Sequence, residues 1–322
     1  MRGLFALITL SLSVASSGVL ASSSCIAFDT EWNLLSFGFH GRDFNASTSD
    51  TWARGNATDI TTAGRPPFNG ANTECYLAAL VNAIYVFGAD VSKPSDVYIY
   101  DATAKRWSAQ TTSVGTLDLS SFEAILDHDT NVFYALSQGE VYSLFLGSLT
   151  TAQSNPIPWE NIQAAPPNIA ARSYDPIMAN ANNFIYFFGV PNTPAGEAPI
   201  YMIHFSFFPP DPVQFEGGFP DVRGKATSFF VDGTFQQQIA FIPDDGSHTF
   251  IIDVKANVTQ IMAGPSIIDS AATYFASTGA LVQLSSSGNV SWLPFSPSNA
   301  SANSAAMWMP VQSLADLVVG VL

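Results

Sequence analysis

The sequence contains few charged residues, and few of these are basic. Lys and Arg number 11 against 26 Asp and Glu, which gives a net charge of −15 over 322 residues. Proteins that bind nucleic acid or anionic lipid draw much of their affinity from basic patches. The composition therefore argues against nucleic acid and acidic membranes as partners, and it suits a soluble protein in an acidic or sugar-rich surrounding.

Cysteine is also scarce, with only Cys25 and Cys75 in the chain. Two cysteines allow at most one disulfide, and an oxidising compartment would favour it. Such a bond would tie the start of the mature chain to a point 50 residues further on. Two buried free thiols are the alternative.

A long apolar run is missing as well. The run that begins at Leu4 ends near Val14, which is short of the roughly 20 apolar residues that span a membrane. Arg2 before the run and small residues up to Ala21 after it are typical of a secretory signal peptide, residues 1–21. A buried N-terminal helix is the alternative. We expect a secreted, extracellular protein whose mature chain has 26 acidic and 10 basic residues and no membrane span.

Five Asn-x-Ser/Thr sequons agree with secretion. Each accepts an N-linked glycan only in a secreted chain and only where it is exposed. The candidate glycosylation sites are Asn45, Asn56, Asn257, Asn289 and Asn299.

Helical periodicity is nearly absent before the last dozen residues, and short Val-, Ile-, Phe- and Tyr-rich runs alternate with turn residues instead. These runs repeat. Tyr85, Tyr134 and Tyr186 mark equivalent strands 49 and 52 residues apart, and Ile239 and Leu281 continue the series at spacings of 53 and 42. A period of about 40–50 residues with three or four strands per unit indicates an all-β protein, a β-propeller.

The number of blades follows from the repeated units. Five are clear, and a segment at 28–52 of strand and turn character adds a sixth. A seventh blade could be assembled from the two ends, so we expect six or seven. A two-sheet sandwich is the alternative fold, although it does not predict a period near 50 residues. The predicted propeller domain covers 22–300, followed by a tail at 301–322.

The stretch 83–107, AIYVFGADVSKPSDVYIYDATAKRW, resembles a kelch repeat. Kelch units have a double glycine after the second strand, then a Tyr-Asp pair, then a Trp. Here Gly88 is followed by Ala89, so the double glycine is incomplete. The chain as a whole is similar to secreted kelch-like proteins of fungi, related in fold to the propeller of galactose oxidase. The resemblance implies blade packing and turn formation for Tyr85, Gly88, Tyr100 and Trp107.

The same resemblance prompts a search for copper ligands. Galactose oxidase binds copper through two His and two Tyr, one of them cross-linked to a Cys. The four histidines here, His40, His128, His204 and His248, show no pair at short ligand spacing. We interpret them as surface or satisfied core residues and expect no cofactor.

The acidic run at 127–129 begins like a calcium loop. An EF-hand loop needs Gly at its sixth position and Glu at its twelfth, where this chain has Val132 and Gln138. A polar hairpin turn fits better, and no metal site is expected.

Sequence motifs for catalysis are absent, so the catalytic residues are unknown at this stage. A nucleophile elbow, a zinc-protease motif, a phosphate loop and a dinucleotide fingerprint are all missing. Glycosidases need two nearby carboxyl groups, which the sequence cannot select. Glu31, Asp43, Glu123 and Glu216 fall near predicted strand ends and are interpreted as solvated.

Three functions remain open. The first is a non-catalytic binding protein for an extracellular carbohydrate or protein, with Trp52 in a projecting loop as the ligand candidate. The second is a hydrolase or lyase that uses carboxylates in the propeller channel. The third is a cell-surface adhesion protein, if the tail is a GPI signal with attachment near Ser301 or Asn303. Alternatively, the tail is a short docked helix or a ring-closing strand. Three or more acids or histidines converging in one pocket of the central channel would favour an enzyme, whereas exposed Trp or Tyr at equivalent sites of several blades would favour a lectin.

Overall fold

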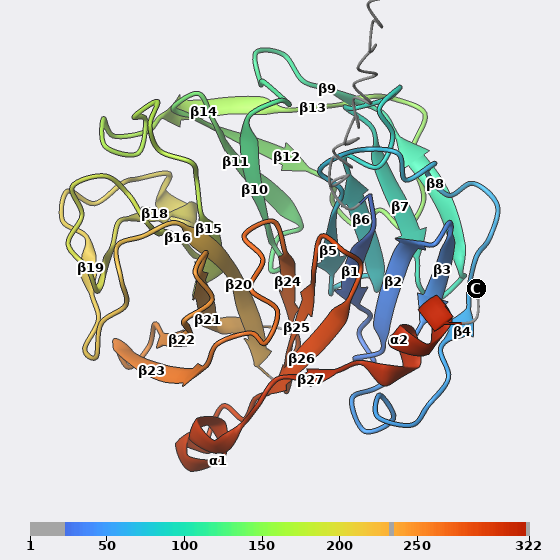
Figure 1. Cartoon of the computed structure of the whole chain (residues 1–322). Coiled ribbons are helices and arrows are strands. Elements are labelled where there is room, and N and C mark those ends of the chain that lie inside the picture. Colours follow the sequence, from blue (N-terminus) through green and yellow to red (C-terminus); the bar gives the residue numbers. More distant parts are fainter. Residues whose placement is uncertain (1–22, 232–234, 320–322) are drawn as a thin grey trace, which may run out of the picture.

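Six small sheets stand around a central axis in the computed structural model, which describes residues 23–231 and 235–319 (Figure 1). Each of the six is antiparallel, and its strands pair in the order in which they occur in the chain. The protein is therefore a six-bladed β-propeller. The all-β prediction is confirmed, and six is the correct choice between the two predicted blade numbers.

The first three blades have four strands each. They are β1 Cys25–Phe28, β2 Leu34–Phe39, β3 Arg42–Asn45 and β4 Thr58–Asp59; β5 Glu74–Ala78, β6 Ala83–Phe87, β7 Val97–Asp101 and β8 Arg106–Gln110; and β10 Phe122–Asp127, β11 Val132–Ser137, β12 Glu140–Phe145 and β14 Glu160–Ala164. A short parallel pair, β9 Thr112–Ser113 and β13 Ile157–Pro158, forms between segments of the second and third blades.

The last three blades are less uniform. They are β15 Met178–Ala181, β16 Phe184–Phe187 and β18 Ile200–Met202; β20 Gly224–Val231, β21 Phe235–Pro243, β22 His248–Asp253 and β23 Val258–Ala263; and β24 Thr273–Ala276, β25 Ala280–Leu284, β26 Val290–Pro294 and β27 Met309–Pro310. The fourth blade also carries the pair β17 Glu197–Ala198 and β19 Val213–Gln214, and the 3-10 helix η1 Ile203–Phe205. Helices α1 Ala300–Ala305 and α2 Gln312–Val319 lie near the C-terminus.

The repeat seen in the sequence corresponds to one position in the blade. Tyr85, Tyr134, Tyr186, Ile239 and Leu281 all lie in second strands, namely β6, β11, β16, β21 and β25. The first strands contact one another in a closed ring, in the order β1, β5, β10, β15, β20, β24 and back to β1. They therefore form the wall of the central channel.

Aromatic side chains fill the spaces between blades. Phe133 of the third blade lies 4.9 Å from Phe87 and 5.0 Å from Tyr76 of the second, measured between ring centroids. Both contacts have the edge-to-face geometry that aromatic pairs prefer. Each blade is apolar on both faces, so neighbouring blades bury each other's surfaces and fix the diameter of the ring.

The first and last blades meet without sharing a strand (Figure 1). Strand β1 contacts β24, and the seam is covered by Val311, just before α2, and by Leu314 of α2, which pack in one cluster with Trp52. The backbone N–H of Ser313 donates to the carbonyl of Trp52 at 3.2 Å. The tail that begins at residue 301 is thus part of the fold, since it supplies β27 to the sixth blade and α2 to the seam.

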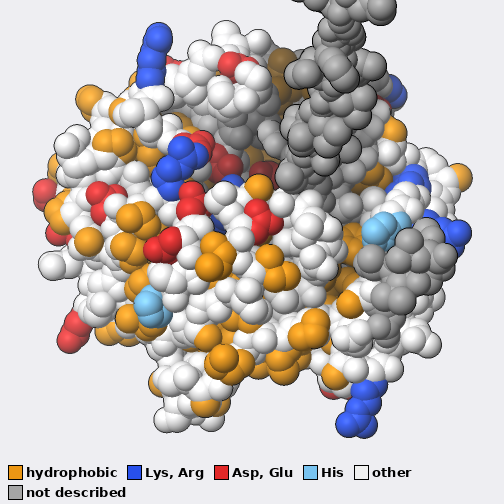
Figure 2. Space-filling view, viewed as in Figure 1, with side chains coloured by type: hydrophobic (Ala, Val, Ile, Leu, Met, Phe, Trp, Pro, Cys, Tyr) orange, Lys and Arg blue, Asp and Glu red, His pale blue; other side chains and the backbone are white. Residues whose placement is uncertain are grey.

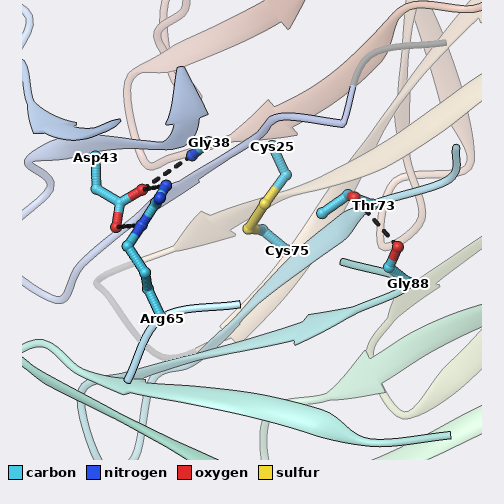
Figure 3. The surroundings of a disulfide bond; sticks show 7 residues. All are labelled: Cys25, Gly38, Asp43, Arg65, Thr73, Cys75 and Gly88. Atoms are coloured by element: carbon cyan, nitrogen blue, oxygen red, sulfur yellow. Dashed lines mark hydrogen bonds and ion pairs between the residues drawn. A yellow bond between two sulfur atoms is a disulfide. The ribbon is translucent and has the colours of Figure 1, made fainter. Parts of the chain in front are cut away.

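The predicted disulfide between Cys25 and Cys75 is confirmed, with the two Cα atoms 5.8 Å apart. It joins β1 to β5, the first strands of two neighbouring blades. Figure 3 shows this bridge and, nearby, the side chain of Arg65 directed at the carboxylate of Asp43. The bond therefore links two walls of the channel.

The predicted signal peptide, residues 1–21, lies outside the described residues. Within 23–231 and 235–319, no helix has the length and apolar character needed to cross a membrane.

Candidate functional site in the central channel

The first strands surround a cavity of about 160 Å³ along the propeller axis. The cavity opens into a wider mouth of about 1160 Å³. Glu74, Glu123 and Lys225 line both spaces and so stand where the mouth narrows into the channel. Figure 2 shows acidic and basic side chains close together near the middle of one face of the molecule.

The polar groups at this narrowing come from equivalent places in different blades. Glu74 is the first residue of β5, while Glu123, Lys225 and Tyr274 are each the second residue of β10, β20 and β24. Because all four lie at the start of a first strand, the ring of first strands brings them to one end of the channel. Glu74, Glu123 and Lys225, from three blades, line both the cavity and its mouth, whereas the hydroxyl of Tyr274 accepts a hydrogen bond from Nε2 of Gln283 in its own blade.

Within β5, Glu74 and Tyr76 lie on the same side of the strand because side chains alternate with a period of two. The hydroxyl of Tyr76 donates to Oε2 of Glu74, and it also lies 3.3 Å from the carbonyl of Ala124 in the third blade. Burial raises the pKa of Tyr76 well above its usual value. Tyr76 is therefore a neutral hydrogen-bond donor that fixes the Glu74 carboxylate.

The two glutamates differ in how firmly they hold a proton. Burial, followed by the charge of Glu74, raises the pKa of Glu123 well above its usual value. Burial also raises the pKa of Glu74, but there the hydrogen bond from Tyr76 and the charge of Lys225 act in the opposite direction. The charge of Lys225 opposes the rise at both carboxyl groups, so the hydrogen bond from Tyr76 is the contact that distinguishes them, and it favours ionisation at Glu74.

Aromatic rings lie at the other end of the cavity, where Phe230 and His128 line it. The ring of Phe230 in β20 lies 5.3 Å from Trp32 of the β1–β2 turn and 5.3 Å from His128 of the β10–β11 turn. These side chains come from three different blades and contact one another through Phe230. They form a floor opposite the polar mouth.

His128 in this floor is 4% exposed and lines the cavity. Its Nδ1 lies 2.9 Å from Oε1 of Gln236, and burial lowers its pKa. Nδ1 is thus placed to donate to this amide oxygen when it carries a proton. Nε2 makes no hydrogen bond with the described residues, and its nearest acidic oxygen is Oδ1 of Asp129 at 3.4 Å.

Another lining atom without a hydrogen-bond partner among the described residues is Oγ1 of Thr273. Buried polar atoms are nearly always paired with protein, water or ligand. Two such atoms, one at the mouth and one at the floor, indicate a cavity suited to a polar occupant.

Trp52, the ligand candidate from the sequence, is fully buried, with 0% of its surface exposed. Its ring is stacked with Phe28 at 6.1 Å and meets Trp292 edge to face at 4.9 Å, while its Nε1 donates to the carbonyl of Ser47. The prediction that Trp52 projects from its loop towards a ligand was wrong. The loop folds back, and Trp52 fills the seam between the first and last blades. No face of the ring is open to a ligand.

The residues assigned to blade packing lie in the second blade. Tyr85 is 0% exposed, and its hydroxyl donates to the carbonyl of Leu149 at 2.9 Å. Tyr100 and Trp107 face each other across β7 and β8 with ring centroids 5.0 Å apart. Gly88 has a φ of +66°, and a Cβ there would lie 2.1 Å from the carbonyl oxygen of Asn72.

Of the four acids expected to be solvated, Glu31 and Glu216 are exposed. Asp43 is instead fully buried and paired with Arg65, and Glu123 lines the channel. Glu74 was missed in the sequence. The repeat could have identified Glu74, because Glu74 and Glu123 are 49 residues apart, the same spacing as between Tyr85 and Tyr134.

The remaining histidines, His40, His204 and His248, are exposed. Among the residues that the structure describes, no group of three His, Cys, Asp or Glu side chains could hold a metal ion. Four of the sequon asparagines are exposed and Asn45 is half-buried; the exposed four are Asn56, Asn257, Asn289 and Asn299.

Comparison with known proteins gives no family model that matches the chain and no curated protein sequence that matches it significantly.

Proposed function

We propose that this propeller is a secreted, kelch-like binding protein that holds an extracellular carbohydrate at the mouth of its central channel. One observation carries the proposal: Glu74, Glu123 and Lys225 converge from three blades where the mouth narrows. Carboxylates accept hydrogen bonds from sugar hydroxyls, and an ammonium group donates to hydroxyl oxygens. A channel mouth of this size and polarity suits a hydroxyl-rich ligand.

A binding site on the outer rim receives less support. Rim lectins would present aromatic rings on which sugars stack, yet none of the six tryptophans and ten tyrosines, all within the described residues, is exposed. The channel mouth instead offers hydrogen bonds and charge. The ligand is therefore held mainly by polar contacts.

The proposal is tested by binding measurements on the purified mature chain. We expect binding on an array of fungal and plant glycans, followed by titration calorimetry with the best ligand. Glu74→Ala and Lys225→Ala should each weaken binding about 10- to 150-fold, the range for hydrogen bonds to charged groups. Glu216→Ala, at an exposed site outside the mouth, is the matched control and should bind normally. No binding across the array would refute the proposal.

A further inference from the structure

The cluster at the channel mouth has a composition that simple binding does not require. It combines two carboxyl groups from adjacent blades, Glu74 and Glu123, with a tyrosine that fixes one of them and a lysine that faces both. Two carboxyl groups in one site are the machinery of glycoside hydrolysis, in which one acts as acid and the other as base. The role of each depends on its own surroundings.

We infer that this site hydrolyses glycosidic bonds, with Glu123 as the general acid and Glu74 as the general base. This inference rests on the proposed function, since the substrate is the carbohydrate held at the mouth. Tyr76 is a positioning residue that acts through Glu74. Lys225 supplies the positive charge that offsets the negative charge of the carboxyl pair.

The assignment of the two roles follows from the contacts. Glu74 accepts a hydrogen bond from Tyr76, which stabilises its ionised form. Among the described residues no such hydrogen bond is directed at Glu123, and the negative charge of Glu74 makes ionisation of Glu123 harder. The group that stays protonated is the one able to donate to a leaving oxygen.

The reaction balances without any co-reactant other than water. The Glu74 carboxylate removes a proton from a water molecule as the water oxygen bonds to the anomeric carbon. The bond from that carbon to the glycosidic oxygen breaks, and its electron pair stays on the oxygen. The Glu123 carboxyl donates its proton to that oxygen. The two carboxyl groups have then exchanged protonation states, and proton exchange with solvent restores them.

The space around the pair is adequate for this step. The cavity below the carboxyl groups, about 160 Å³, has room for the attacking water, since one water needs only about 10–15 Å³ of such space. The wider mouth above, about 1160 Å³, can hold the sugar units on either side of the bond. His128 Nε2 and Thr273 Oγ1 are the unpartnered polar atoms that water in the channel would satisfy.

The test measures hydrolysis and binding on the same protein. The probes are 4-nitrophenyl glycosides and oligosaccharides of glucose, xylose, mannose and N-acetylglucosamine. We expect the wild-type chain to hydrolyse at least one. Glu123→Gln, which keeps the shape but cannot donate the acid proton, should bind the same oligosaccharide while kcat falls about 10²- to 10⁴-fold. Glu74→Gln should behave similarly, and Glu216→Gln, the matched control, should retain full activity.

The pH dependence of kcat/KM distinguishes a positioning role of Tyr76 from a purely structural one. Loss of the Tyr76 hydroxyl removes the hydrogen bond that favours ionised Glu74, so Tyr76→Phe should move the acid limb of kcat/KM to higher pH. A protein that binds oligosaccharides but hydrolyses none of the probes would overturn the hydrolase inference and leave the binding proposal standing. Wild-type activity in Glu123→Gln would also overturn it. A protein that neither binds nor hydrolyses would refute both.

Discussion

The guanidinium of Arg65 forms two hydrogen bonds with the carboxylate of Asp43, one from Nε at 2.9 Å and one from Nη2 at 2.7 Å. Asp43 is fully buried, and its Oδ1 also accepts the backbone N–H of Gly38 (Figure 3). The Arg65–Asp43 salt bridge thus attaches the segment that connects the first and second blades to β3. This ion pair adds to the apolar packing between the same two blades, where the ring of Phe37 meets that of Trp107 at 5.1 Å.

Removal of Arg65 should destabilise the fold strongly. Arg65→Met leaves the Asp43 carboxylate buried without its cation, and such a change lowers the free energy of unfolding by about 3–5 kcal/mol. The matched control is Arg42→Met, because Arg42 pairs with Asp59 at the surface with side chains 66% and 43% exposed. Exposed pairs contribute less than about 1 kcal/mol. Urea unfolding measures the free energy of unfolding of both variants. An equal decrease in the two would contradict the role given to Asp43.

The channel carboxyl pair should leave a signature in the pH dependence of stability. The pKa of Glu123 is raised in the folded state, so the folded protein holds this proton where the unfolded chain has lost it. The stabilising effect of the proton is complete below the usual glutamate pKa of about 4.3 and declines as pH rises towards the raised folded pKa.

Glu123→Gln removes this dependence, because Gln does not titrate. The free energy of unfolding of Glu123→Gln, relative to the wild type, should therefore increase as pH rises above about 4.3. Urea unfolding at a series of pH values measures the difference, with Glu216→Gln as the control. A difference that stays constant with pH would show that Glu123 titrates normally.

The disulfide should make a large contribution to stability. It closes a loop with a sequence separation of 50 residues, for which the chain-entropy relation gives about 4 kcal/mol. The double variant Cys25→Ser, Cys75→Ser should lose about that amount in urea unfolding. Reduction should add the mass of two hydrogens to the intact wild-type protein. A chain that has two free thiols before any reductant is added would contradict the bond.

Helix α2 should be needed to hold the seam between the first and last blades. Leu314 is 1% exposed and packs in the seam cluster, so Leu314→Ala should cost about 2–5 kcal/mol. Met307, 67% exposed, provides the control Met307→Ala, with a change within about 0.5 kcal/mol. Thermal and urea unfolding measure both. If Leu314→Ala unfolds like the control, α2 does not support the seam.

This packing also bears on the GPI alternative. Cleavage near Ser301 or Asn303 would remove β27 and α2, together with the buried Trp308 and Val311. Because the tail packs as a part of the propeller, we expect the mature chain to keep it.

Glycosylation should follow the exposure of the sequon asparagines. Expressed in a eukaryotic secretory host, the chain should carry glycans at the four exposed sites, Asn56, Asn257, Asn289 and Asn299. Asn45 should be modified least, because its Oδ1 accepts the backbone N–H of Ser47 at 2.7 Å and the residue is half-buried. Peptide mapping after enzymatic deglycosylation reads each site. Full occupancy at Asn45 alone would contradict the ranking.

The fold could be predicted because its signal is repeated. Tyr85, Tyr134 and Tyr186 recur at nearly constant spacing, since each fills the same place in a second strand. The blade number was harder, because the spacing of the strands does not reveal whether the two ends of the chain complete one shared sheet. The structure gives each end a complete sheet of its own.

The site was harder to predict than the fold because it depends on distances between blades. Glu123 looked like an ordinary acid near a strand end, and only ring closure brings it beside Glu74 and Lys225. The prediction that Trp52 binds a ligand was wrong because its burial could not be seen in the sequence. A tryptophan in a polar loop resembles a surface residue until the loop folds back over a buried seam.

The ring of separate blades affects how the protein can gain or lose a blade during evolution. No blade borrows a strand from a distant part of the chain, so every blade is encoded by one uninterrupted stretch of sequence. A duplication or deletion of one such stretch would add or remove a whole sheet without dividing the sheet of any other blade. Propellers of this kind can thus change size by single genetic events, and the apolar faces of the remaining blades need only readjust to a new circumference.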